Sequence, residues 1–112
     1  MAARAVRWSE AAEHDVEDIV DHIALDSFIN AEAVVERLYK QALSLEHFAE
    51  RGRRIPELSR RQRAQRANWR ELVVRPWRIM YAIEGGTVFV VGVVDSRRDV
   101  RVWLANHLGV DR

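Results

Sequence analysis

The spacing of apolar residues changes once along this chain, and that change limits the fold more than any other feature. Before Gly52, apolar residues recur at steps of three and four, which is typical of amphipathic helices. After Pro56 the pattern changes to a period of two over residues 77–83 and to an almost unbroken β-branched run over residues 87–94, both typical of β-strands. The chain of 112 residues is short enough for one domain. We therefore expect a single α+β domain over residues 1–112.

Two helices are expected in the first half, after a short strand at residues 4–8. Ser9 is a good helix N-cap, and one apolar face continues from there to about Leu25. Asp26 and Ser27 interrupt the pattern, and a second apolar face runs to about Glu50. Helices joined by so short a link form an antiparallel hairpin.

The second half predicts three strands and a short closing helix. Strands are expected at Trp69–Val74, at 77–83 and at 87–94, with the Gly85–Gly86 turn between the last two. The order is β-α-α-β-β-β with a short C-terminal helix, which predicts a helical hairpin packed on a small, mostly antiparallel sheet. Residues 59–68 are basic and lack apolar anchors, so we expect a loop there.

Charge is divided unevenly between the two halves. Residues 1–50 hold four basic and eleven acidic side chains, whereas residues 51–112 hold fourteen basic and six acidic ones. Residues 51–78 alone contain ten arginines and two acids, Glu57 and Glu71. A basic half of this kind indicates an anionic partner.

Several kinds of chemistry find no support in the sequence. The chain has no cysteine, which excludes thiolate metal sites and cysteine nucleophiles. His14, Asp18 and His22 share a helix face, but no further ligand is evident, so we expect neither a metal nor a cofactor. No apolar stretch has the length of a signal peptide or a membrane span, which predicts a cytoplasmic protein.

Eight short blocks, in this order and spacing, resemble the RelE/ParE superfamily of toxins from type II toxin–antitoxin systems. The likeness covers about residues 5–105, and its blocks are Trp8–Ala12, Asp15–Ile19, Ile23–Ser27, Gly52–Arg53, Ile55–Leu58, Arg70–Leu72, Trp77–Tyr81 and Val94–Asp99. The link at Asp26–Ser27 and the blocks from Gly52 to Leu58 are closer to ParE than to RelE.

The resemblance implies one of two modes of action. RelE-like members cleave mRNA on the ribosome with a basic cluster, of which this chain keeps Arg78 and Arg98 but neither the lysines nor the tyrosine. ParE-like members lack that set and act on DNA gyrase, stalling the cleaved-DNA complex. We therefore expect no catalytic residues, a gyrase-binding toxin that arrests growth and stabilises plasmids, and alternatively an mRNA interferase or a non-toxic binding module.

The resemblance also implies a cognate antitoxin, a small DNA-binding protein whose disordered tail folds on the toxin. The chain would form a homodimer or a toxin–antitoxin heterotetramer, with no membrane partner, and the sequence leaves open whether the isolated toxin is a monomer or a dimer. The residues expected to contact the antitoxin are Val16, Ile19, Val20, Leu38 and Leu45. Those expected to contact the target are Arg75, Arg78, Arg97, Arg98, Arg101 and Trp103.

Overall fold

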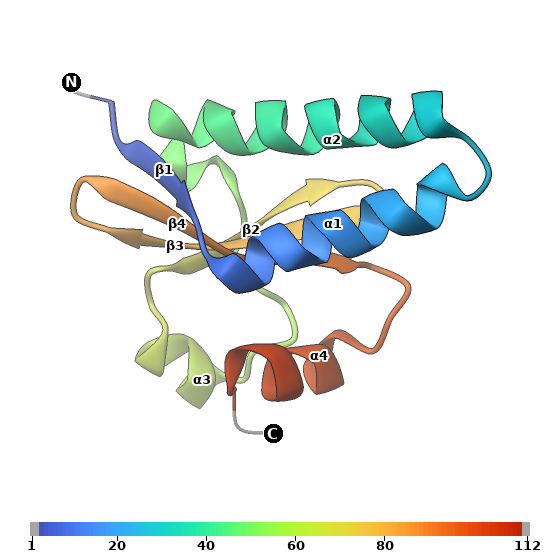
Figure 1. Cartoon of the computed structure of the whole chain (residues 1–112). Helices are drawn as coiled ribbons and strands as arrows, with labels where there is room; N and C mark the ends of the chain where they lie inside the picture. Colours follow the sequence, from blue (N-terminus) through green and yellow to red (C-terminus); the bar gives the residue numbers. More distant parts are fainter. Residues whose placement is uncertain (1–2, 111–112) are drawn as a thin grey trace.

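The computed structural model describes residues 3–110, and the four terminal residues of the predicted domain lie outside this range. It has three layers, with two long helices on one face of a sheet and two shorter helices on the other (Figure 1). The elements are β1 (Ala5–Trp8), α1 (Glu10–Ala24), α2 (Phe28–Leu43), η1 (Ser44–Glu46), η2 (Ala49–Arg51), α3 (Arg60–Gln65), β2 (Trp69–Val74), β3 (Trp77–Glu84), β4 (Thr87–Asp95) and α4 (Val100–Leu108).

The sheet has four strands in the order β1-β4-β3-β2. β1 runs parallel to β4, while β2, β3 and β4 form antiparallel pairs. The turn between β3 and β4 needs Gly85, whose φ of 58° lies in the left-handed region that favours glycine. The predicted α+β class, element order and mostly antiparallel sheet are confirmed.

The two long helices begin where their cap residues predict. The Ser9 hydroxyl accepts the Ala12 N–H, and the Ser27 hydroxyl accepts the Asn30 N–H. The second helix is shorter than expected, because it ends at Leu43 and continues as the turns η1 and η2. These tighter turns carry the chain back to the sheet, where the Glu46 carbonyl accepts the Arg4 N–H at 2.9 Å.

The prediction of a loop over residues 59–68 is wrong for its central part. Residues 60–65 form α3, which a capping box starts: the Ser59 hydroxyl accepts the Gln62 N–H, and the Gln62 side chain accepts the Ser59 N–H. Periodicity could not reveal this helix, since it has no buried residue.

Alternate residues of the strands enter two separate cores. We call the side covered by α1 and α2 the hairpin face, and the side covered by α4 and residues 53–66 the opposite face. The core of the hairpin face includes Leu38, Leu45, Ile79, Tyr81, Val88 and Val90. The core of the opposite face is smaller and includes Ile55, Met80, Val94, Trp103 and Leu104.

Candidate functional site

Arg78 lies on β3, on the opposite face, and two glutamates enclose its guanidinium. Its Nε donates to Glu71 Oε1 at 2.7 Å, and its Nη1 donates to Glu57 Oε2 at 2.9 Å. Glu71 is fully buried, and its other oxygen accepts from Arg53 Nε at 2.6 Å. Only 4% of Arg78 is exposed. The structure therefore contradicts the prediction that Arg78 faces a target, because its donors are already used inside the protein.

The same pairing fixes the ionisation of Glu57. Hydrogen bonds from Arg78 lower the pKa of Glu57 below its ordinary value, against the opposing effect of burial. Since Glu57 precedes α3, its ion pair ties that segment to the sheet. The sequence carries one signal for this network, the pair of acids, Glu57 and Glu71, among ten arginines, but it does not indicate that both acids pair with Arg78.

Trp103, a predicted target contact, belongs to the core. It is 5% exposed and lies so close to Gly92 that any side chain there would collide with its ring. The ring stacks on His107, whose Nε2 is 3.0 Å from Asp15 Oδ2. Asp15 also accepts the Val93 N–H, and burial raises its pKa. These contacts fix α4 to α1 and β4 and leave little of the Trp103 side chain available to a target.

The other predicted target contacts are exposed. Arg97 is held by Asp95, whose Oδ1 accepts from Arg97 Nε at 2.9 Å, and this hydrogen bonding lowers the pKa of Asp95. Arg75, Arg98 and Arg101 are also exposed, and none of them forms an ion pair within residues 3–110. These three side chains present free cations to solvent.

The residues predicted to contact an antitoxin divide into two groups. Leu38 and Leu45 have no exposed surface and Val16 is 3% exposed, because their apolar spacing packs them against the sheet. Leu38 and Leu45 are core, which contradicts their prediction as a partner surface, whereas Val16 keeps a small exposed area at the base of a hollow between α1 and α2. Ile19 and Val20 are half-buried and reach the outside of the hairpin.

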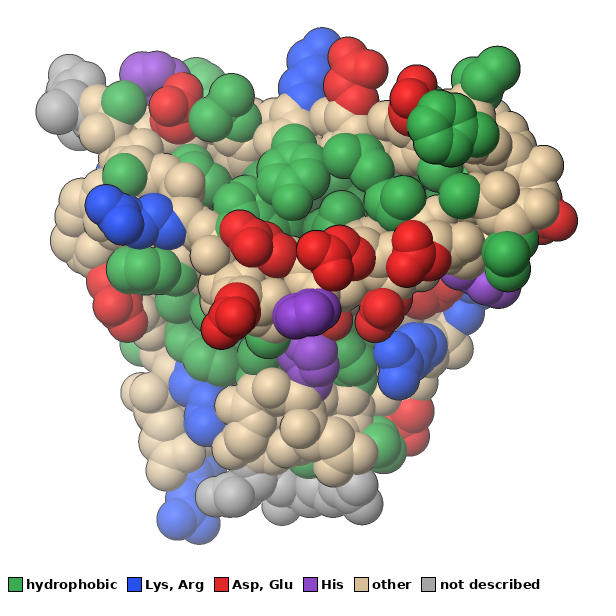
Figure 2. All heavy atoms as spheres, in the orientation of Figure 1, with side chains coloured by type: hydrophobic (Ala, Val, Ile, Leu, Met, Phe, Trp, Pro, Cys, Tyr) green, Lys and Arg blue, Asp and Glu red, His purple; other side chains and the backbone are tan. Residues whose placement is uncertain are grey.

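A hollow of about 370 Å³ lies between α1 and α2. Hydrophobic side chains fill the space between the helices, and a row of acidic side chains runs along α1 (Figure 2). Burial raises the pKa of Tyr39 in this hollow, and the nearby Glu13 and Glu17 raise it further. The hollow is lined by Val16, Val20, Val35 and Tyr39 together with the acids Glu13, Glu17 and Asp21. An apolar floor with an acidic rim suits an amphipathic helix that carries basic residues.

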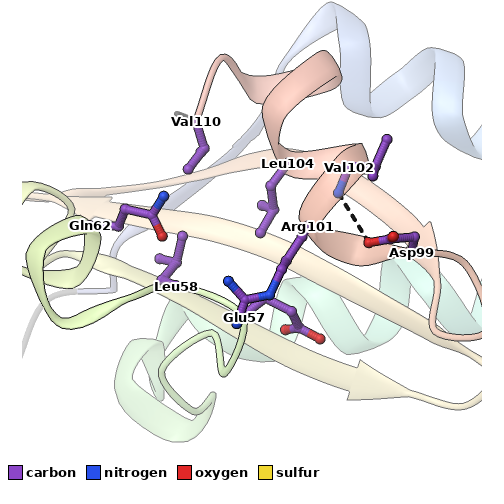
Figure 3. Close-up of a pocket in the computed structure, with 8 residues that line it drawn as sticks. All are labelled: Glu57, Leu58, Gln62, Asp99, Arg101, Val102, Leu104 and Val110. Atoms are coloured by element: carbon purple, nitrogen blue, oxygen red, sulfur yellow. Dashed lines mark hydrogen bonds between the residues drawn. The ribbon is translucent and has the colours of Figure 1, made fainter. Parts of the chain in front are cut away.

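A second hollow, of about 210 Å³, lies on the opposite face between α4 and the segment that leads into α3 (Figure 3). Leu58, Leu104 and Val110 point into it, and Arg101 stands at its edge. Sequence reasoning missed this hollow because the helix α3 that helps to form it was not expected. The remaining residues of its wall are Glu57, Gln62, Asp99 and Val102.

A third hollow, of about 520 Å³, lies between α1 and α4 and is lined by Asp15, Asp18, Arg98 and His107 among others. Over residues 3–110, no group of three or more histidine or acidic side chains is arranged to hold a metal ion. In the same range, no helix is both long and apolar enough to cross a membrane.

Comparison with known proteins identifies one family and several related solved structures. Residues 6–100 match the model of the ParE toxin of the type II toxin–antitoxin system parDE. The chain is 19% identical to a chain of the chromosomal ParDE toxin–antitoxin system of P. aeruginosa, with a TM-score of 0.66, covering 83% of this chain and 96% of that one. It is also 19% identical to a chain of the RelBE2 toxin–antitoxin complex of Mycobacterium tuberculosis, with a TM-score of 0.56, covering 85% and 93%. No curated protein matches the sequence.

Proposed function

The chain belongs to the ParE family of toxins from type II toxin–antitoxin systems, and from this premise we propose that it arrests bacterial growth by binding DNA gyrase and stalling the cleaved-DNA complex. The gyrase target is what the likeness to ParE implies. A cognate antitoxin neutralises the toxin by covering it.

The observation that carries this proposal is the enclosure of Arg78. In the alternative, an mRNA interferase, Arg78 would contact the scissile phosphate and stabilise its developing charge. Here Arg78 is 4% exposed and its donors are bonded to Glu57 and Glu71. Freeing it would leave Glu57 without its ion pair and the fully buried Glu71 with Arg53 alone, at a considerable cost in stability. This arrangement supports action by binding rather than by RNA cleavage.

The exposed arginines supply a surface for the target. Arg75, Arg98 and Arg101 carry no internal ion pair within the described range, so their guanidinium groups are free to contact phosphates or carboxylates. A complex of gyrase with cleaved DNA is strongly anionic, which suits this surface.

The hollow between α1 and α2 suits the antitoxin. Val20, Val35 and Tyr39 offer an apolar floor, while Glu13 and Glu17 on its edge are acidic. An antitoxin helix in this position would place apolar residues on the floor and lysines or arginines along its flank. A further, acidic segment of the antitoxin would reach the arginines of the second half.

A supercoiling assay with purified gyrase tests the target. We expect the chain to convert plasmid DNA to the linear form, and its expression in bacteria to induce the DNA-damage response while cellular mRNA stays intact. Cleavage of mRNA at the ribosomal A site, with gyrase unaffected, would establish the interferase instead. Normal growth on expression without an antitoxin would leave only the non-toxic binding module.

A further inference from the structure

Three large apolar side chains are exposed together where α1 passes into α2. Leu25 is 83% exposed, Phe28 is 69% exposed and Ile29 is 78% exposed. We call these three residues the apolar tip. Clusters of exposed apolar side chains on a small domain usually mark a surface that a partner covers.

The apolar tip has a strongly acidic setting. Asp21, Asp26 and Glu32 surround it in the sequence and are all exposed. The sequence has no lysine or arginine between Arg7 and Arg37. A surface that covers the apolar tip must therefore combine an apolar recess with positive charge.

The hollow on the opposite face has both properties. Its volume of about 210 Å³ exceeds the roughly 150 Å³ of a protein cavity that accepts benzene, so it has room for a phenyl ring. Leu58, Leu104 and Val110 make its walls apolar (Figure 3).

Charged side chains of both signs stand at the edge of this hollow. Glu57 pairs with Arg78, whereas the Asp99 carboxylate accepts the Val102 N–H and keeps its negative charge. Arg101, in contrast, is exposed and forms no ion pair within residues 3–110. A ligand side chain in the hollow would therefore meet an available cation at its mouth.

We propose that the apolar tip of one copy of this chain docks in the opposite-face hollow of a second copy, with Phe28 inserted and Arg101 facing the acids beside the tip. The chain itself provides both complementary parts, an acidic tip with an exposed phenyl ring and an apolar recess of sufficient size with an exposed arginine at its edge. Within one molecule the two cannot meet, because the link between α1 and α2 and the pair α3–α4 lie in different layers (Figure 1).

The contact is head to tail, since it joins two different surfaces. Each copy in such a pair keeps one unused tip or hollow, so further copies can add and the assembly grows with concentration. Because an ion pair contributes, high salt should weaken the association. The proposal concerns the chain by itself and does not depend on gyrase or an antitoxin.

Sedimentation velocity over a range of concentrations tests the proposal with the purified full chain. We expect the sedimentation coefficient of the native chain to rise with concentration. Phe28→Asp should keep the chain monomeric, as should Arg101→Glu and Val102→Trp, which fills the hollow. Phe48→Asp is the matched control, because Phe48 is 67% exposed but lies outside the tip. Circular dichroism checks that every variant is folded.

Mixing a variant of the apolar tip with a variant of the hollow tests the proposal most directly. Phe28→Asp retains an intact hollow and Arg101→Glu retains an intact tip, so an equimolar mixture should form heterodimers and stop there. A native chain that stays monomeric at the highest concentration would overturn the proposal, as would a mixture that stays monomeric or loss of association in Phe48→Asp. If the native chain is monomeric and Phe28→Asp weakens antitoxin binding, the tip belongs to the antitoxin instead.

Discussion

The two faces of the sheet are covered by different elements and stabilised by different interactions. On the hairpin face, two long helices bury apolar side chains such as Leu38 and Leu45 against the strands. On the opposite face, a shorter helix and a loop segment cover a smaller apolar core beside an ion network. Within residues 3–110 the two buried charged side chains, Glu71 and Arg78, both belong to this network.

This difference separates two sources of stability. Burial of apolar surface contributes about 25 cal/mol per Å² and does not depend on protonation. A buried ion pair depends on the charge of every member, and removing one member leaves the others without compensation. Substitutions on the two faces should therefore differ in their response to pH as well as in size.

The largest loss is expected on the hairpin face. Leu38→Ala should reduce the free energy of unfolding by about 4 kcal/mol, because it leaves a cavity in a core with no access to solvent. Urea unfolding followed by circular dichroism measures the change. Leu43→Ala on the same helix is the control, since Leu43 is 54% exposed and its loss should cost less than about 0.5 kcal/mol. Equal effects of the two substitutions would contradict this assignment of the core.

On the opposite face, Glu71→Ala should cost about 3 kcal/mol, because it leaves the buried guanidinium of Arg78 with Glu57 alone. The loss should be a little smaller than for Leu38→Ala, since Glu57 still compensates part of the charge. Glu84→Ala, an exposed glutamate at the end of β3, provides the comparison in the same urea measurement. A loss no greater than that of the control would show that the network adds nothing to stability.

Lowering the pH should reduce the stability contributed by the opposite face and leave that of the apolar hairpin core unchanged. Because the pKa of Glu57 is lowered in the folded chain, its stabilising effect is complete above its ordinary value of 4.5 and is lost as the pH falls below it. Glu57→Gln should thus be less stable at neutral pH and lose less stability on acidification. Asp15, with a raised pKa, acts in the opposite direction, but it is unchanged in the variant.

The free energy of unfolding, measured at several pH values from neutral to acid, gives the slope of stability against pH for each variant. Leu38→Ala should retain the native dependence on pH, since it removes no charge. If Glu57→Gln and Leu38→Ala had the same slope, the acid sensitivity would not come from the opposite face.

The smallest effect on folding is expected for the exposed arginines. Arg75→Glu combined with Arg98→Glu should change the free energy of unfolding by less than about 0.5 kcal/mol, since both side chains are exposed. Growth inhibition and gyrase inhibition should nevertheless fall steeply, because the reversed charges repel an anionic target. Arg7→Glu, an exposed change on β1, should leave both activities intact. A folded and fully toxic double variant would refute the role of these arginines.

The sequence predicted the hairpin face well because its buried apolar residues recur at the regular spacing of a helix. Ser9 and Ser27 begin the helices, and regular apolar steps define the buried side. The same steps could not say whether an apolar residue faces the sheet or a partner. Leu38 and Leu45 were therefore expected on a binding surface and lie instead in the core.

The opposite face was harder to predict because its contacts join distant segments. Arg78 meets Glu57 and Glu71 only after the sheet and the loop have come together, and no local spacing encodes that meeting. Trp103, among exposed arginines in the sequence, is buried because Gly92 leaves room for its ring. The capping box at Ser59 was the one local signal for α3, and a helix of six residues has little else to show.

The parallel pairing of β1 with β4 places Ala5 opposite Thr87. The sheet therefore brings together a segment that is synthesised early and one that is synthesised late. At synthesis rates of roughly 5–20 residues per second, β4 leaves the ribosome several seconds after the hairpin does. During that interval α1 and α2 have no sheet to cover their apolar faces. A chain whose synthesis stops before Thr87 has no strand to receive β1, so truncated products cannot assemble this sheet.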